Sequence, residues 1–161
     1  IAGPAQFSIG DQRLDGYSEA LKEAGISQDA SLIVRGDLRI QGGESAMEQL
    51  LALDNPPTAI FACNDLTAIG AFKAVRRHGL QIPDDISIIG YDDIFFAQAT
   101  DPPLTTIAQP LKVITQNAMA LLLQQINSRS SMAKDGTTPP QIAIQPDLVI
   151  RQSTAQLVDE R

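Results

Sequence analysis

The sequence of 161 residues predicts an α/β fold, in which a parallel, doubly wound sheet carries helices on both faces. Short apolar runs alternate with stretches of helical periodicity in the order β-α-β-α-β-α-β. Parallel strands need crossover connections, and helices in those connections cover the sheet. Several apolar runs end on polar side chains, and ligands of such sheets bind beyond the carboxyl ends of the strands. The sequence therefore predicts a small-molecule site at that edge.

Composition limits the kinds of protein that this chain can be. Hydrophobic residues make up 43% and charged residues 19% of the sequence, as in one globular domain or one lobe of a larger protein. The net charge of −7 argues against direct binding to the phosphate backbone of nucleic acid. The single cysteine, Cys63, allows no disulfide framework and no metal cluster, and no cofactor is expected. No apolar run is long enough to span a membrane, and no signal peptide is visible. The chain opens at Ile1 without methionine, so we expect a fragment.

The first expected elements are the end of a strand and a helix. Ile1–Gly3 is predicted to be the strand end. A helix is predicted from Gln12 to Ala24, because apolar side chains recur there at helical spacing. We expect Asp11 to cap its start and Gly25 to stop it.

Two further strands and two helices follow. Leu32–Val34 is predicted as a short strand, and Glu44–Leu53 as a helix that the segment Asn55–Pro57 terminates. The apolar run Ala59–Cys63 is the next predicted strand. It leads directly into a helix predicted from Asp65 to His78.

The pattern changes in the last third of the chain. Ile86–Tyr91 and Leu104–Ala108 are predicted strands, and a long helix is predicted from Gln109-Pro110 through Ile126. The remaining segments are expected to be an exposed polar loop at 128–140, strands at 141–144 and 148–150, and a frayed tail from Ser153.

Polar residues beyond the strand ends are the candidate ligand contacts. Asn64 can donate and accept hydrogen bonds at once, whereas the adjacent Asp65 is expected to cap a helix. Asp92 could accept hydroxyl protons from a ligand or cap the turn that follows it. Arg13 opens a helix, where a cation is unfavourable, so we expect a partner such as Asp92 or a ligand. Gln109 could hydrogen-bond a hydroxyl group or line a hinge.

The residue pattern gives little support to catalysis. His78 is the single histidine and falls at the expected exposed end of a helix, so it forms no Ser-His or Cys-His pair. Asp65 and Asp92 could act as acid and base on a glycoside, but a capping role for Asp65 leaves no second acid. Neither a Walker A motif nor G-x-G-x-x-G is present. The sequence therefore predicts a binding protein and no enzyme.

Several short segments occur in a specific order along nearly the whole chain. They are Ile1–Pro4, Arg13–Tyr17, Pro57–Asp65, Ala68–Ala71, Gly79–Pro83, Asp85–Asp93, Pro103–Ile107 and Gln109. In this order they resemble the effector-binding core of LacI/GalR-type transcriptional regulators, such as ribose, purine and lactose repressors. The resemblance implies a lobe like those of type I periplasmic binding proteins, mainly the C-terminal one.

The resemblance also implies a division of the chain. It assigns residues 1–109 to the C-terminal lobe, 110–128 to a crossover associated with the N-terminal lobe, 129–140 to an exposed loop, 141–152 to returning strands and 153–161 to a tail. The helix-turn-helix that binds operator DNA is expected outside this chain. The whole protein is expected to be a cytoplasmic homodimer without membrane contact, in which a small-molecule effector changes lobe geometry and operator affinity.

Site residues follow from the same resemblance. Family positions that contact the effector match Arg13, Asn64, Asp92 and, in some members, Gln109. Many members place an aromatic residue after the Gly-Asp pair to stack on the ligand ring, but this chain has Leu38. Leu38 and Phe7 are expected to line an apolar wall of the site. A sugar or small polyol is the favoured effector, of open identity.

The dimer interface is expected at the third helix and at the turn after Asp93. The candidate residues are Ile69, Phe72, Phe95 and Phe96, because exposed apolar patches usually mark interfaces. The alternative is that these side chains fill the core of their own lobe.

Two other classes of function stay open from the sequence. A sugar-binding protein of a transporter would share the lobes, and a signal peptide in place of a helix-turn-helix would identify it. A glycoside hydrolase would turn over a chromogenic glycoside.

Overall fold

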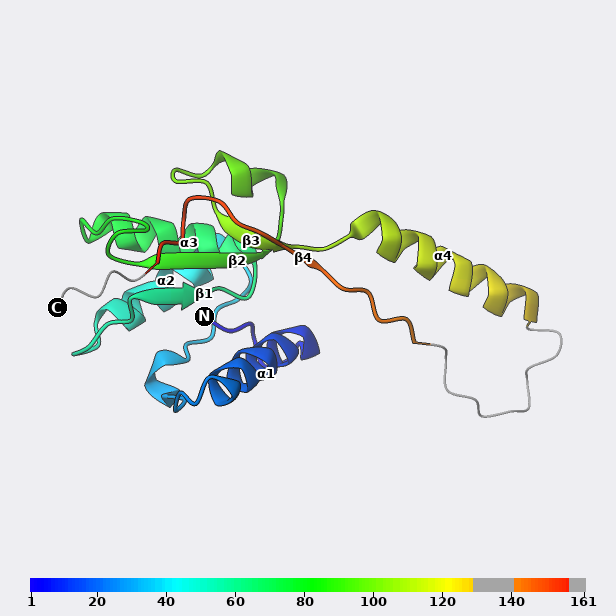
Figure 1. The fold of residues 1–161 in the computed structure, drawn as a ribbon, viewed down its shortest axis with the longest axis horizontal. Helices are drawn as coiled ribbons and strands as arrows, with labels where there is room; N and C mark the ends of the chain where they lie inside the picture. Colours follow the sequence, from blue (N-terminus) through cyan, green and yellow to red (C-terminus); the bar gives the residue numbers. More distant parts are fainter. Residues whose placement is uncertain (129–140, 157–161) are drawn as a thin grey trace. The chain divides into compact units, whose positions relative to one another are not determined.

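The computed structural model describes residues 1–128 and 141–156, with side chains described except at 127 and 128. The chain forms two compact units, Ile1–Ala108 with Leu148–Arg161, and Gln109–Asp147. The first unit holds α1 (Ser8–Glu23), α2 (Ile40–Leu51), α3 (Asp65–Arg77), β1 (Ala59–Phe61), β2 (Ser87–Asp92) and β3 (Thr105–Ala108), together with two short 3-10 turns, η1 (Ala30–Leu32) and η2 (Phe95–Ala99) (Figure 1). The second unit holds α4 (Leu111–Ser128), and β4 (Asp147–Val149) lies at the boundary between the units.

The sheet has the order β1-β2-β3-β4, and the pairs β1–β2 and β2–β3 are parallel. The amino-terminal segment extends this arrangement beyond β1. Ala2 forms a parallel bridge with Arg35, and the amide of Cys63 donates to the carbonyl of Ile1 at 3.0 Å. The first residues therefore lie between the segments around 35 and 62, as expected for a strand end. The parallel α/β class is confirmed.

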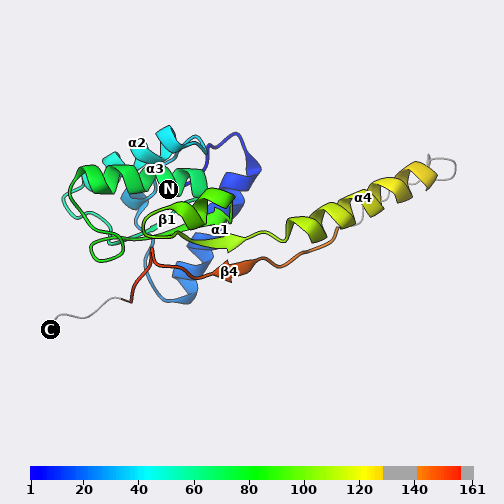
Figure 2. The same ribbon diagram turned by 90° about the horizontal axis from the view of Figure 1, so that it is seen from above.

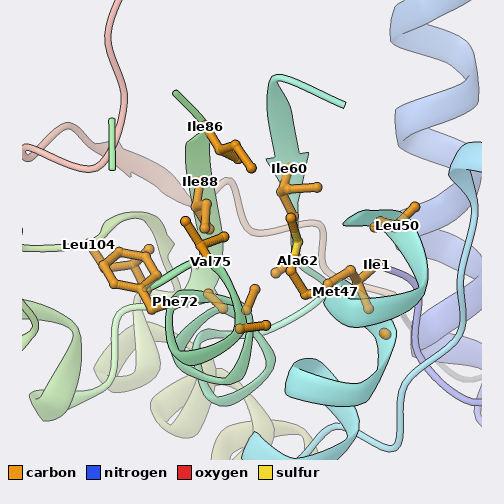
Figure 3. Packing of buried hydrophobic residues seen from close by; sticks show 14 of the residues in the cluster. Ile1, Met47, Leu50, Ile60, Ala62, Phe72, Val75, Ile86, Ile88 and Leu104 are labelled. Atoms are coloured by element: carbon orange, nitrogen blue, oxygen red, sulfur yellow. The ribbon is translucent and has the colours of Figure 1, made fainter. Parts of the chain in front are cut away.

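Helices cover both faces of the sheet, with α2 and α3 on one side and α1 on the other (Figure 2). Two glycines let α2 and α3 approach backbone to backbone: a Cβ on Gly43 would overlap the carbonyl of Thr67, and one on Gly70 would overlap that of Ile40. Between α2, α3 and the sheet lies the buried core (Figure 3), whose larger members include Met47, Leu50, Ile60, Phe72, Val75, Ile86, Ile88 and Leu104.

Two predicted helix starts were wrong. α1 begins at Ser8, so Asp11 lies inside its first turn, where its carboxylate pairs with Arg35 at 2.9 Å, and does not cap the helix. α2 begins at Ile40, four residues earlier than predicted from Glu44. In both cases a glycine-containing first turn, which weakens the helical signal in sequence, is stabilised by contact with another segment. The stop of α1 is confirmed, since Gly25 has φ +70°.

Other boundaries were also wrong. Leu32–Val34 contains the end of η1 and not a regular strand. Gln141–Ile144 is not in a strand, whereas β4 overlaps the second predicted terminal strand.

The predicted frayed tail also proved wrong where it begins. Ser153 is fully buried: its hydroxyl accepts from the amide of Thr105 at 2.8 Å and donates to the carbonyl of Ile88 at 2.6 Å. The segment around Ser153 is therefore fastened to the sheet. Residues 129–140, which hold most of the predicted loop, and 157–161, which end the predicted tail, lie outside the described residues.

The second unit consists mainly of α4, whose bounds agree closely with the predicted long helix. Its exposed large apolar side chains are Leu111, Val113, Met119, Leu122, Leu123 and Ile126. Within the described residues, no helix combines the length and the hydropathy needed to cross a membrane.

Candidate ligand site

Arg13 and Asp92 form an ion pair at the carboxyl end of β2. Nη2 of Arg13 donates to Oδ1 of Asp92 at 3.1 Å, and the two side chains are 11% and 28% exposed. Nη1 donates to the backbone carbonyl of Cys63, and the guanidinium carbon lies 3.8 Å from the ring centroid of Tyr91. Three contacts thus fix the guanidinium plane, as favoured for a planar cation that stacks and donates in parallel. The partner expected for Arg13 is present, but the reason given for it was wrong: α1 begins at Ser8, so Arg13 lies inside the helix and does not open it.

The backbone that presents Asp92 has an uncommon conformation. Asp92 has φ 117° and the next residue, Asp93, has φ 53°. Positive φ is disfavoured for residues with a Cβ and persists only where surrounding contacts impose it. Here Asp93 pairs with Arg151 at 2.6 Å, and the amide of Ile94 donates to Asp65 at 2.8 Å.

Asn64, and not Asp65, takes the capping role that was predicted for Asp65 from sequence. Asn64 has extended backbone and is the residue that caps α3, with Oδ1 accepting from the amide of Thr67 at 2.9 Å. The expected capping role of Asp65 is therefore wrong. Sequence favours Asn and Asp equally at this position, and only the backbone angles decide which of two neighbours is the cap.

Asp65 instead lies fully buried beneath the site. Its Oδ1 accepts from the hydroxyl of Thr106 at 2.5 Å, and its Oδ2 accepts from the amide of Ile94. A Cβ on the facing residue, Gly90, would overlap Oδ1, so the glycine makes room for the carboxylate. Burial raises the pKa of Asp65, the two hydrogen bonds oppose that rise, and the nearby charges of Asp92 and Asp93 add to it.

Leu38 is joined to the same edge of the sheet through Asn64. The side-chain amide of Asn64 donates to the carbonyl of Leu38 at 3.0 Å, and Leu38 has φ 66°. The contacts of Arg13 with Asp92 and Cys63, and of Asn64 with Leu38, form a continuous chain across this edge. The structure therefore brings together Arg13, Asn64, Asp92 and Leu38.

The contacts described above do not include the other two expected ligand residues, whose roles stay predictions. Phe7 directly precedes α1 and is 52% exposed. Gln109 is the first residue of the second unit, and its role in the site stays a prediction.

A pocket of about 70 Å³ lies next to this edge, between α1 and the sheet. Its lining is mainly apolar and includes Arg13, Tyr17 and Cys63, but not Asp92, Asn64 or Leu38. Burial raises the pKa of the Cys63 thiol, which keeps that thiol protonated.

Three residues of the site were missed by reasoning from the sequence. Tyr91 stacks on Arg13, Arg151 holds Asp93, and Thr106 binds Asp65. Tyr91 could have been found from its place beside Asp92 in the same strand. Nothing local marks Arg151, because its partner is 58 positions away along the chain.

His78 takes part in a surface network away from this edge. It approaches Glu48 at 2.6 Å, and Arg77 and Lys73 pair with Glu44. Across residues 1–128 and 141–156, no group of three or more His, Cys, Asp or Glu residues is placed to hold a metal ion.

Comparison with known proteins adds three findings. A family model described as "Periplasmic binding protein-like domain" matches residues 1–154. The HTH-type transcriptional repressor CytR of Escherichia coli K12 is 48% identical over 129 residues, which are 80% of this chain and 38% of the repressor. The ribose operon repressor of Haemophilus influenzae is 37% identical over 157 residues, which are 98% of this chain and 46% of the repressor.

Solved structures of similar proteins agree. A structure described as "transcriptional regulator CelR-cellobiose complex" has a TM-score of 0.86 at 33% identity, covering 95% of this chain and 45% of that one. A LacI-type regulator from Bacillus cereus has a TM-score of 0.88 at 28% identity, covering 97% and 53%. The chain therefore spans about half the length, or less, of the relatives that it matches.

Proposed function

The chain belongs to the periplasmic binding protein-like domain family and to the LacI group of regulators within it, and on this premise we propose that it is the effector-binding and dimerisation part of a DNA-binding transcriptional regulator. The relatives compared above are named as repressors or regulators, which favours this function over that of a transporter's sugar-binding protein. Because such a regulator binds operator DNA, we expect the whole protein in the cytoplasm.

The ion pair of Arg13 with Asp92 is the observation that carries the proposal. A guanidinium donates from a rigid fork, and a carboxylate accepts from hydroxyl groups, so the two together can bind neighbouring hydroxyls of one ring. Their mutual contact orients both groups before the ligand arrives. The effector we propose is a sugar or small polyol with vicinal hydroxyl groups. The cellobiose complex of CelR and the name of the ribose operon repressor support that class.

Other residues are assigned supporting roles in the proposed site. Asn64 has its amide engaged by Leu38 and its oxygen by Thr67, so it shapes the edge and offers the ligand its remaining hydrogen-bonding capacity. Leu38 and Phe7 provide apolar surface for the face of a sugar ring, and Gln109 provides a hydrogen bond or a hinge. Asp65 is buried with both oxygens engaged, so an acid–base pair with Asp92 gains no support.

The division into lobes remains a proposal. Residues 1–109 would build the C-terminal lobe, 110–128 would cross to an N-terminal lobe, and 141–152 would return as strands. In the whole protein, effector binding would close or re-angle the two lobes and change the spacing of two DNA-binding domains. Such coupling requires an effector that binds one global state more tightly than the other.

The proposed partner in the dimer is a second copy of the chain. Phe95 and Phe96 are 74% and 61% exposed and pack edge to face, with ring centroids 5.7 Å apart. Such an exposed aromatic pair is typical of an interface. Ile69 is half-buried and stays a candidate for the interface. Phe72 is 5% exposed and lies in the core of its own lobe, so we no longer propose it as an interface residue.

Calorimetry on the full-length regulator tests the proposed effector class. The panel consists of D-ribose, cellobiose and a ribonucleoside, each paired with a deoxy form whose rings keep no two neighbouring hydroxyl groups. We expect one diol-bearing compound to bind and its deoxy control to bind at least tenfold more weakly. Equal affinity for a compound and its deoxy form would contradict the proposed role of Arg13 and Asp92.

Gel shifts test the regulatory part of the proposal. The full-length protein is expected to bind operator DNA with an affinity that the effector changes. This chain alone, with net charge −7, is expected not to shift that DNA. A shift by the chain alone would contradict the proposed division of labour.

A further inference from the structure

The turn that follows β2 is held at three consecutive residues by three different parts of the chain. Asp92 pairs with Arg13 of α1 at 3.1 Å, and Asp93 pairs with Arg151 at 2.6 Å. The amide of Ile94 donates to Asp65, the first residue of α3, at 2.8 Å. Each contact therefore joins the turn to a segment distant in sequence.

These contacts impose a conformation that the turn would not adopt alone. Asp92 and Asp93 both have positive φ, although each carries a Cβ. Residues held in this way cluster at ligand sites, where the surrounding structure over-determines them. Release of one contact is expected to let the turn relax and to move the carboxylate of Asp92 away from Arg13.

Arg151 is the contact that comes from the carboxyl-terminal part of the chain. Its Nη2 binds Asp93, its Nη1 donates to the carbonyl of Leu104 at 2.8 Å, and its amide donates to the hydroxyl of Thr105 at 2.9 Å. The side chain is 18% exposed. One guanidinium thus joins the turn after β2 to the start of β3.

β3 and the segment that contains Arg151 itself are the two parts of the first unit that lead to and from the second unit. β3 continues along the chain into residues 109–147, and the chain returns from them at Leu148, three residues before Arg151. Arg151 therefore lies on the returning segment and binds the start of β3, the strand whose last residue, Ala108, directly precedes the second unit.

We propose that Arg151 is a positioning residue for the ligand site. It touches no ligand, but through Asp93 it holds the turn that presents Asp92 to Arg13, and it ties that turn to the two connecting segments. The inference rests on the proposed effector site. It adds a residue through which ligand binding at that site would affect the segments that lead to and from the second unit.

The first experiment needs no ligand. Hydrogen exchange in the full-length protein is measured at the amide of Ile94, with the amide of Ala62, bonded to Ile89 within the sheet, as reference. Arg151→Ala is expected to speed exchange at Ile94 at least tenfold and to leave Ala62 unchanged. Asp93→Asn is the second variant, because Asn tolerates positive φ and the contact of Arg151 with Leu104 survives. Unchanged exchange at Ile94 in both variants would overturn the proposal.

The second experiment measures affinity for D-ribose and cellobiose by calorimetry. Both variants are expected to bind at least tenfold more weakly, and the double variant no more weakly than the worse single one, because the two residues act as one pair. Arg151→Lys, which keeps the charge, is expected to recover part of the loss, which a purely structural role would not predict. Arg76→Ala is the matched control: Arg76 pairs with Asp101 in the same unit, and neither contacts the turn.

The two proposals fail in different ways. If no diol-bearing compound of the panel binds the wild-type protein, the proposed effector class is wrong and the exchange measurement alone decides the role of Arg151. If a sugar binds and both variants keep wild-type affinity, Arg151 is not a positioning residue, and the proposed function stands.

Discussion

Replacement of Arg13 by alanine in the full-length protein would remove the guanidinium from the centre of the proposed site. The variant loses the pair with Asp92, the bond to the carbonyl of Cys63 and the contact with Tyr91. Asp92 is left partly buried, at 28% exposed, without this cation. Truncation of one partner of a buried charge pair at a binding site costs about 2–5 kcal/mol, and the partial exposure of Asp92 favours the lower part, about 2–4 kcal/mol.

This free energy corresponds to an affinity about 30-fold to 700-fold weaker, since each 1.4 kcal/mol is a factor of ten. Calorimetry with the diol-bearing compound that binds the wild-type protein measures it directly. Arg13→Lys keeps the charge but loses the planar fork, so an intermediate loss is expected. Arg35→Ala serves as the control, because Arg35 pairs with Asp11 of the same helix, α1, away from Asp92.

The coupling between Arg13 and Asp92 gives the sharper check. Arg13→Ala and Asp92→Asn are expected to weaken binding by amounts that do not add, because we propose that the two side chains bind the same pair of hydroxyls. Additive losses would show two independent contacts. Wild-type affinity in Arg13→Ala would refute the reasoning altogether.

Three further predictions concern stability and assembly. Ser153→Ala leaves the amide of Thr105 and the carbonyl of Ile88 without their buried partner, so thermal unfolding should show a loss of about 2–4 kcal/mol in the free energy of unfolding. The control variant, Ser31→Ala at an exposed position, should lose almost none. Equal melting temperatures of the two variants would mean that the segment around Ser153 is frayed. If the full-length protein forms the proposed dimer, Phe95→Glu with Phe96→Glu should convert it to monomer in sedimentation experiments with no change in the circular dichroism spectrum. A dimer that persists would exclude these residues from the interface. Because the pKa of Asp65 is raised above its ordinary 3.8, its ionisation costs stability as pH rises through the window between 3.8 and the raised value. Asp65→Asn should therefore gain stability relative to wild type across that window in denaturant titrations at a series of pH values, and a parallel pH dependence of the two proteins would contradict the raised pKa.

Local patterns in the sequence were sufficient for the fold class. The alternation of apolar runs with helical periodicity predicted the parallel strands and α3. A helix with one buried face has apolar residues at helical spacing, and a strand with both faces buried is a short continuous apolar run. Gly25 and Gly79 marked the ends of α1 and α3 for a similar reason, because a positive φ favours glycine.

Boundaries that depend on other segments could not be read in this way. The first turns of α1 and α2 are stabilised by contacts with distant residues, and the choice between Asn64 and Asp65 as cap depends on one pair of backbone angles. Ser153 looked like part of a tail because its partners, Thr105 and Ile88, are 48 and 65 positions away.

The candidate site shows the same difference between what the sequence and what the tertiary structure determined. Polar residues after strand ends identified Asn64 and Asp92 as candidates, because parallel strands bring their carboxyl ends to one edge, whereas Arg13 was identified from its expected place in the first helix and from the family resemblance. Only the tertiary structure showed that Asp65 and Arg151 hold the turn that presents Asp92, and that the backbone there has positive φ. A sequence records which groups can bind, whereas long-range contacts, which leave no local periodicity, decide how those groups are held.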